Sequence, residues 1–286
     1  MPELPEVQTT VQGLQILLNK KITNIKIYST KLRYAIPKNI QKNLKNSKIT
    51  KIYRIGKYIV VNLKNHYSLL FHLGMSGRLR ILKQSKFVKK KHDHFVLITE
   101  KYTLIFNDVR KFGFIDLLKT KEIFKTYYIS RLGLDALDSK LNERYFRDKI
   151  YKSIVPIKQI LLNQEIIAGI GNIYANEILY DAKISPFTKG CSLTILEIKK
   201  IIKSIKKILR IAINSGGSTL KDYVSVDGTV GNFQNNFKVY NRDGKKILGY
   251  EIKRIMQYGR PTFYCPDIQL ISKEKREDLK YKSKFY

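Results

Sequence analysis

Cysteine is scarce in this 286-residue chain. Its two cysteines, Cys191 and Cys265, lie far apart, and no signal peptide precedes them. A disulfide framework is therefore not expected, and the pattern is typical of a reducing cytoplasm. Long apolar runs are also missing, since segments such as Tyr58–Leu63 and Ser68–Leu73 are far too short to cross a bilayer. We expect a soluble intracellular protein that makes no contact with a membrane.

Acidic residues are few as well. The sequence holds 23 Asp and Glu against 55 Lys and Arg, which gives a formal net charge of +32. A positive field of this size captures polyanions, and nucleic acid is the commonest of them. Lys, Ile, Asn and Tyr are all abundant, as under AT-rich codon bias, so part of the charge is incidental surface. The charge is thus a necessary footprint of a nucleic-acid-binding protein and not a sufficient one.

Internal repeats and long linkers are absent. The order of helices and strands is therefore predicted from the spacing of apolar residues along the sequence. Apolar residues at helical spacing predict a helix over the first 20 or so residues. Short β-branched and aromatic runs follow and predict an antiparallel sandwich or barrel. These runs are Ile22–Tyr28, Ile49–Ile55, Tyr58–Leu63, Tyr67–Leu73, Arg78–Leu82, Phe95–Thr99 and Tyr102–Phe106.

The helical period returns at about Leu141. Thr194 and Glu197 have the spacing of a capping box and predict the start of a long basic helix that ends near Asn214. Beyond Asn232 the pattern is strand-like again, with turns predicted at Asn241–Gly244 and Tyr258–Pro261.

Pro2 becomes the N-terminus if Met1 is removed, which a small second residue generally permits. An α-amino group has a pKa of about 7.7–8, against about 10.4 for lysine, so a useful fraction is neutral at pH 7. Such an amine can attack an electrophilic sugar carbon and form a Schiff base. Glu3 and Glu6 stand beside it, and a carboxyl in a partly dry pocket can donate and abstract protons. The alternative is that Pro2 is the first residue of the helix and the glutamates complement the helix dipole.

A set of motifs decides between these alternatives. They are Met1-Pro-Glu-Leu-Pro-Glu-Val7, Arg54-Ile-Gly-Lys-Tyr58, His72-Leu-Gly-Met-Ser-Gly77, Lys91-His-Asp-His94, Asn107-Asp-Val-Arg-Lys-Phe-Gly113, Ala168-Gly-Ile-Gly-Asn-Ile-Tyr-Ala-Asn-Glu177 and Gly216-Gly-Ser-Thr-Leu220. In kind and order, up to about residue 266, they resemble the formamidopyrimidine-DNA glycosylases, bacterial 8-oxoguanine DNA glycosylases that are also lyases at abasic sites.

The resemblance implies catalytic roles for four residues. Pro2 would be the Schiff-base nucleophile and Glu3 the proton donor. Lys57 would donate the proton in β-elimination and Arg260 in δ-elimination, with Arg260 also reaching the DNA phosphates. Without the resemblance, Lys57 reads as a solvated residue at the start of a strand.

The resemblance also implies a set of DNA contacts. An excised base must leave the duplex, and the apolar Met75, the forked cation Arg110 and the aromatic Phe112 are similar to the family's intercalating trio. The remaining implied DNA-binding residues are His72, His94, Lys158, Asn172, Lys221 and Arg260. His72 and His94 could equally be hydrogen-bonded core histidines.

Gly169-Ile-Gly-Asn172 lacks the third glycine and the βαβ setting of a dinucleotide site. It fits a turn entering a helix that holds a DNA phosphate, the helix–two-turn–helix element of the family.

The C-terminal segment departs from the family, in which most members end in a hairpin pinned by zinc on four cysteines. Lys245–Gly249 has no cysteine, Ile268 stands where the last ligand would be, and no histidine follows His94. Cys265 alone cannot build a four-coordinate site. We therefore expect no cofactor and a zincless finger, packed through Ile247, Leu248, Ile252, Ile255 and Phe263. The alternative is a decaying finger with reduced activity.

The expected fold is α+β: an N-terminal helix with an antiparallel β-sandwich, then a helix–two-turn–helix domain with a β-hairpin finger. The expected domains are 1–130, 131–232, 233–270 and a basic tail over 271–286, with damaged double-stranded DNA in a basic cleft. We expect a monomeric, nucleoid-associated bacterial enzyme that removes 8-oxoguanine and formamidopyrimidines and cuts the backbone by β,δ-elimination. The alternatives are an endonuclease VIII-like glycosylase for oxidised pyrimidines, a non-catalytic basic DNA-binding protein and a generic RNA-binding protein. The last lacks any RNA-recognition signature.

Overall fold

The structure, a computed structural model, describes residues 2–84, 87–218, 226 and 231–271. Its contacts divide the chain into one unit made of Met1–Arg131 and Ala212–Gln234, and a second made of Leu132–Ile211 and Asn235–Tyr286. The first division falls one residue beyond the boundary expected at 130. The helical domain expected over 131–232 stays a prediction, and the described residues within Ala212–Gln234 group with the N-terminal unit. The finger belongs to the second unit and is not a separate body.

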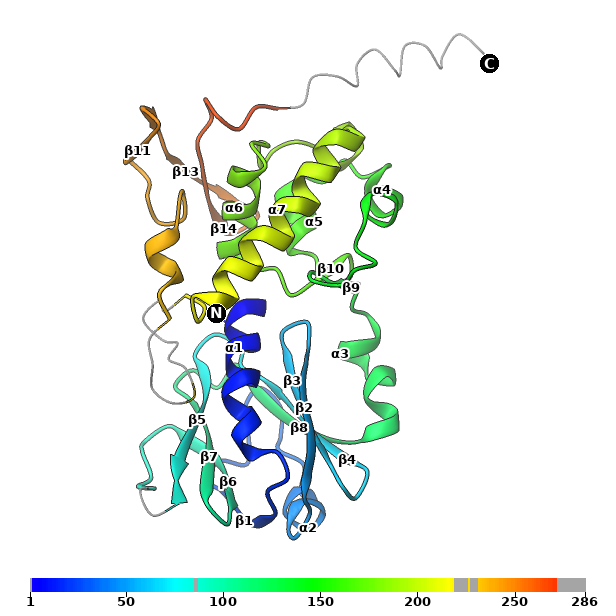
Figure 1. Cartoon of the computed structure of the whole chain (residues 1–286), viewed down its shortest axis with the longest axis vertical. Helices are drawn as coiled ribbons and strands as arrows, with labels where there is room; N and C mark the ends of the chain where they lie inside the picture. The colour runs from blue at the N-terminus through cyan, green and yellow to red at the C-terminus, as the bar shows by residue number, and fades with distance from the viewer. Residues whose placement is uncertain (1, 85–86, 219–225, 227–230, 272–286) are drawn as a thin grey trace. The chain divides into compact units, whose positions relative to one another are not determined.

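The first unit is a β-sandwich with a leading helix (Figure 1). Helix α1 (Leu4–Leu14) comes first. One antiparallel sheet has the order β1 (Ile22–Ile27), β6 (Asp93–Thr99), β7 (Tyr102–Asp108), β5 (Gly77–Lys83). The other has the order β2 (Ile49–Ile55), β3 (Tyr58–Leu63), β4 (Tyr67–His72), β8 (Phe114–Lys119). The sequence predicted these strands except β8. Short helices α2 (Ile40–Leu44) and α3 (Tyr127–Ser130) complete the unit.

Side chains that point alternately to the two faces of each strand place the core between the two sheets. In β6, Phe95 and Leu97 join the main apolar cluster, which also takes Val7 and Leu14 of α1. The next residue along, Val96, faces the opposite side of the sheet and packs in a separate small cluster. A period of two with one shared core is what a sandwich requires. The core thus fixes α1, and with it the N-terminus, against the sandwich.

The second unit is mainly helical. Its helices are α4 (Glu143–Ile150), α5 (Ile157–Leu162), α6 (Asn172–Asp181) and α7 (Ile195–Asn214), with a short parallel pair β9 (Leu134–Asp135) and β10 (Ile167–Ala168). At the start of α7, Thr194 N donates to Glu197 Oε2 (2.8 Å) and Glu197 N donates to Thr194 Oγ1 (3.2 Å), which confirms the predicted capping box. None of the helices within the described residues is long and apolar enough to span a membrane.

Two hairpins make up the finger: β11 (Lys246–Ile247) with β12 (Tyr250–Glu251), and β13 (Lys253–Gln257) with β14 (Arg260–Tyr264). Tyr258 and Gly259 both have positive φ, 51° and 72°, as a two-residue hairpin turn requires.

The packing expected for the finger is only partly right. Ile252 and Phe263 are buried with Val239, and Ile247 packs against them. Leu248 is 79% exposed, because it occupies the tip of the β11–β12 turn with φ of 51°.

Candidate functional site

The N-terminus is built around the start of α1. The helix begins at Leu4 with Glu3 as its N-cap, and the proline in its first turn is Pro5. Pro2 therefore precedes the helix, and the interpretation of Pro2 as the first helical residue is wrong. Pro2 is buried and Glu3 is only 2% exposed, so both lie in a largely water-free setting. Met1 lies outside the described residues.

Glu6 is a buried carboxylate used for structure. Its Oε2 accepts the Glu3 N–H (2.9 Å), and its Oε1 accepts the N–H (2.7 Å) and hydroxyl (2.9 Å) of Ser218. Gly217 has φ of +77°, and a Cβ there would lie 3.1 Å from Glu6 Oε1, so glycine is required at this close approach. These bonds commit Glu6 to joining α1 with Gly217–Ser218. The Glu3 side chain takes part in the same capping box, since it accepts the backbone N–H of Glu6. Lys221, expected nearby, lies outside the described residues.

Lys57 lies in the β2–β3 turn, after Gly56 with φ of 55°. It is 8% exposed, so it is not the solvated strand-start residue of the alternative interpretation. The next residue, Tyr58, pairs with His72 across β3 and β4. Lys57 thus stands at the end of the sheet beside that histidine.

His72 is a neutral histidine. Burial, followed by the charges of Lys57 and Arg33, lowers its pKa to about 4. The Gly74 N–H donates to Nδ1 (3.2 Å), so the ring proton resides on Nε2. Its ring stacks on Phe114 with centroids 5.5 Å apart. Any phosphate contact by His72 is therefore an Nε2–H hydrogen bond and not an ion pair.

Met75, Arg110 and Phe112 come together on two adjacent turns of the first unit. Met75 is 39% exposed and Phe112 is 44% exposed. The Arg110 guanidinium carbon lies 4.7 Å from the Phe112 ring centroid. A Cβ on Gly74 would lie 2.4 Å from the Phe112 carbonyl carbon, so the two turns touch through their backbones.

His94 is placed in the interior. It is 5% exposed, and its Nε2 donates to the Asp108 carbonyl oxygen (2.7 Å). This bond favours the alternative of a hydrogen-bonded core histidine, whereas its place in the lining of a pocket with Lys89, Lys91 and Lys111 leaves the phosphate contact a prediction.

Lys158 and Asn172 hold the β13–β14 hairpin. Lys158 is fully buried, and its Nζ donates to the Pro261 carbonyl oxygen (2.9 Å) and to Thr262 Oγ1 (2.7 Å). Asn172 Nδ2 donates to the same carbonyl (3.1 Å). The prediction of surface phosphate contacts by these two side chains therefore changes: their donors face the hairpin instead. Arg260, just before Pro261, remains exposed.

Glu177 anchors the chain that leads into the finger, a role that its motif did not suggest. Its Oε1 accepts the N–H of Val239 (3.0 Å) and Tyr240 (2.8 Å), and its Oε2 accepts the N–H of Lys238 (2.8 Å). Burial raises the pKa of Glu177 and outweighs these three hydrogen bonds, which act to lower it. The signal available in the sequence was an acidic residue in the middle of a helix, beside the apolar Ala175, Ile178 and Leu179.

The finger lacks the donor set of a zinc site. Cys265 is buried, and no group of three or more His, Cys, Asp and Glu suited to a metal occurs among the described residues. Tetrahedral zinc needs four such ligands.

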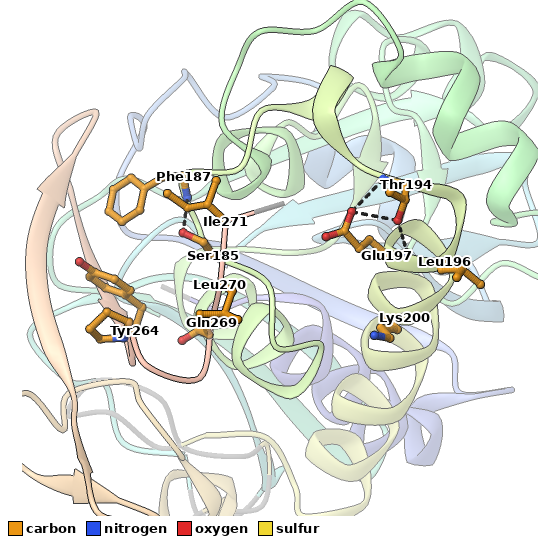
Figure 2. Close-up of a pocket in the computed structure, with 11 residues that line it drawn as sticks. Ser185, Phe187, Thr194, Leu196, Glu197, Lys200, Tyr264, Gln269, Leu270 and Ile271 are labelled. Atoms are coloured by element: carbon orange, nitrogen blue, oxygen red, sulfur yellow. Dashed lines mark hydrogen bonds between the residues drawn. The ribbon is translucent and has the colours of Figure 1, made fainter. Parts of the chain in front are cut away.

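A pocket of about 830 Å³ opens in the second unit and holds none of the predicted site residues (Figure 2). It is lined mainly by apolar side chains, among them Phe187, Leu196 and Tyr264. Its acidic residue, Glu197, is engaged by Thr194 in the helix cap. The pocket therefore offers no constellation for base excision.

Comparisons with known proteins agree with this geometry. Residues 1–115 match the model of the formamidopyrimidine-DNA glycosylase N-terminal domain, and residues 132–224 match that of the formamidopyrimidine-DNA glycosylase H2TH domain. The chain is 43% identical over 273 residues to formamidopyrimidine-DNA glycosylase of Zymomonas mobilis, covering 94% of this chain and 100% of that protein. It is 37% identical over 292 residues to the Bartonella quintana protein of the same name, with the same coverage.

Solved structures give the same result. A Lactococcus lactis FPG mutant in complex with Fapy-dG-containing DNA superposes with a TM-score of 0.87 at 34% identity, covering 94% of this chain and 99% of that one. Lactococcus lactis Fpg in complex with abasic-site DNA also has a TM-score of 0.87 at 34% identity, covering 93% and 99%. A further complex of that protein contains an oxidised pyrimidine in its DNA, with a TM-score of 0.86 at 34% identity and coverage of 94% and 99%.

Proposed function

The chain belongs to the formamidopyrimidine-DNA glycosylase family, and from this membership we propose how its own residues carry out the reaction. It is a base-excision-repair DNA glycosylase that acts on oxidised purines, in a family that also cleaves abasic sites. The observation that carries the assignment of roles is the position of Pro2, which is buried and lies before the N-cap of α1.

The first step is attack by Pro2. After removal of Met1, the neutral secondary amine adds to the sugar C1′, the bond from C1′ to the damaged base breaks, and the departing base takes up the proton that the amine releases. Glu3 supplies a proton as the ring oxygen departs, which opens the sugar and gives the iminium. The placement of Glu3, nearly fully buried and next to Pro2 in the chain, supports this role.

Elimination follows from the iminium. Loss of a proton from C2′ expels the 3′ phosphate, and a second elimination expels the 5′ phosphate, so a one-nucleotide gap remains. Lys57, buried in the β2–β3 turn, is the proton donor proposed for the first elimination. Arg260, exposed at the β13–β14 turn, is proposed to donate the proton in the second elimination and to bind phosphate. Hydrolysis of the imine then frees Pro2.

DNA is the partner of the chain, as its family membership and charge indicate. We propose that Met75, Arg110 and Phe112 fill the gap left by the extruded base. His72 is proposed to contact the DNA backbone through a neutral hydrogen bond, and Asn172 to act through the Pro261 carbonyl that it holds beside Arg260. A monomeric state, a cytoplasmic location at the nucleoid, and a finger that works without zinc complete the proposal.

An endonuclease VIII-like preference for oxidised pyrimidines is the nearest alternative. A Lactococcus lactis relative has been crystallised with DNA containing an oxidised pyrimidine, so specificity within the fold needs a direct comparison. Excision rates on 8-oxoguanine opposite cytosine and on thymine glycol opposite adenine give that comparison. The proposal expects the first rate to exceed the second.

Borohydride trapping tests the nucleophile. Purified protein, checked by mass for loss of Met1, is mixed with a duplex that carries one 8-oxoguanine, and the imine is reduced. We expect a covalent adduct for the wild type and its loss in Pro2→Gly. The matched control is Pro5→Ala, which alters the proline of the first helical turn and leaves the terminal amine in place. An adduct of equal yield in Pro2→Gly would refute the role of Pro2. DNA binding without an adduct or cleavage, on the lesion and on an abasic duplex alike, would favour the non-catalytic DNA-binding protein.

A further inference from the structure

Asp108 lies at the base of the two turns that carry Met75, Arg110 and Phe112. It is the last residue of β7, pairs with Gly77 of β5, and is fully buried. Its carbonyl oxygen accepts from His94 and its N–H donates to the His92 carbonyl oxygen (3.1 Å). The backbone of Asp108 is therefore fixed on both sides by the neighbouring chain.

The carboxylate of Asp108 bridges both turns. Its Oδ1 accepts the Ser76 hydroxyl (2.5 Å) from the Met75 turn and the Arg110 N–H (3.2 Å) from the other. Its Oδ2 accepts the Gly113 N–H (2.8 Å) at the far end of the second turn. Ser76 Oγ closes the set by accepting the Arg110 N–H (3.0 Å). One buried carboxylate thus binds donors on both sides of Arg110 and Phe112 and on the turn of Met75.

The geometry of the second turn needs such support. Lys111, between Arg110 and Phe112, has φ of +54°, a conformation that costs a non-glycine residue about 1 kcal/mol or more. A Cβ on Gly113 would lie 2.7 Å from the His72 carbonyl oxygen, so this turn is also pressed against the first. Hydrogen bonds to an ionised acceptor are roughly twice as strong as neutral ones. The Asp108 carboxylate is placed to offset the strain.

We infer that Asp108, with Ser76, is a positioning residue that holds the Met75 turn and the Arg110–Phe112 turn at one fixed separation, so that the three side chains enter the duplex as a unit. The inference rests on the role proposed above for this trio. Asp108 is buried and touches no DNA itself; it acts through the turns. Side chains that are held in place before binding lose less conformational entropy on insertion, and small displacements of such groups lower affinity or rate.

The test compares Ser76→Ala and Asp108→Asn with Ser68→Ala. Ser68 is a matched control because its hydroxyl is also buried and bonded to side chains, those of Asn62 and Thr120, on the same sandwich. Two single-turnover rates are measured for each protein. The first is excision of 8-oxoguanine from duplex DNA, which needs insertion of Met75, Arg110 and Phe112. The second is cleavage of a preformed abasic site in single-stranded DNA, which needs Pro2 but no insertion of these three side chains.

We expect Ser76→Ala to slow duplex excision tenfold or more, and Asp108→Asn to slow it further. Cleavage of the single-stranded abasic site changes less than twofold, and Ser68→Ala changes neither rate by more than twofold. Equal losses on both substrates, or unchanged duplex excision in Ser76→Ala, would overturn the inference. Thermal unfolding is recorded for each variant, and if Asp108→Asn does not fold, Ser76→Ala decides.

A binding measurement separates this inference from the proposed function. The probe is a duplex that contains a stable abasic analogue and a 2-aminopurine next to the orphaned base. Its fluorescence reports insertion of Met75, Arg110 and Phe112 without any chemical step. We expect the fluorescence change to be reduced at least threefold in Ser76→Ala and retained in Ser68→Ala. If the wild type gives this signal but excises no lesion, the proposed chemistry fails while the positioning role stands. If Ser76→Ala gives the wild-type signal, the positioning role fails whatever the catalytic result.

Discussion

At the scale of single residues, burial decides the chemistry of the ionisable groups. His72 and Glu177 are both shifted toward their neutral forms, because a partly or fully buried charge loses its hydration. For His72 the nearby cation Lys57 acts in the same direction. A histidine in a DNA-binding protein is readily taken for a cation, and here the fold makes it a neutral donor.

The His72 pKa predicts a pH dependence of stability. The folded-state pKa of about 4 lies below the unfolded value of about 6.5, so the unfolded state binds more protons between these values. The contribution of His72 is present above pH 6.5 and is lost as the pH falls toward 4. We expect the wild type to lose about 1–3 kcal/mol more than His72→Asn between pH 7 and pH 4.5. Urea unfolding at both pH values measures this, and parallel losses in the two proteins would contradict it.

At the scale of elements, side-chain bonds to the backbone hold the finger to the helices of its own unit. Lys158 of α5 and Asn172 of α6 bind the Pro261 carbonyl, and Asn176 Oδ1 accepts the Phe263 N–H (2.9 Å). Together with Glu177, these polar groups attach a hairpin too short to be stable alone. The apolar packing of the finger is smaller than the sequence suggested, because Leu248 faces solvent while Ile252 and Phe263 are buried.

Replacing Lys158 tests this attachment. Lys158→Met keeps the aliphatic volume but removes the donors to the Pro261 carbonyl and Thr262 Oγ1. We expect a loss of about 1–3 kcal/mol in the free energy of unfolding, because buried acceptors lose a charged partner. The control is Lys152→Met, at an exposed site, with an expected change within about 0.5 kcal/mol. A loss of equal size in the control would show that Lys158 has no special role.

At the scale of the whole molecule, the sequence combines a net charge of +32 with a finger that lacks the family's usual thiols. The charge favours affinity for DNA of any sequence, and in the proposed function Met75, Arg110, Phe112 and the N-terminus add selectivity for damage. Because Cys265 has no partner thiol in its hairpin, we propose that the finger is stable without a metal.

Metal removal is therefore expected to have no effect. We predict less than 0.1 zinc per chain by elemental analysis, and no change in the unfolding temperature or in 8-oxoguanine excision after treatment with EDTA. Structural zinc contributes strongly to folding where it is present, so its loss would be visible. About one zinc per chain, or unfolding at lower temperature after chelation, would contradict the prediction.

The sequence by itself determined the local features of this protein. Period-two and helical patterns gave β2, β3 and α7 with their observed ends, and the motif from Met1 to Val7 indicated the family, because these signals depend on neighbouring residues. It missed β8, whose six residues gain their strand conformation only by pairing with β4.

Only the tertiary structure decided what the polar side chains face. Lys158 looks like a surface cation in sequence and is buried, whereas Leu248 looks like core and is exposed. It also revealed that Asp108 and Glu177 hold distant segments in place. Burial and hydrogen-bond partners come from chain segments far apart in the sequence, and no local pattern records them.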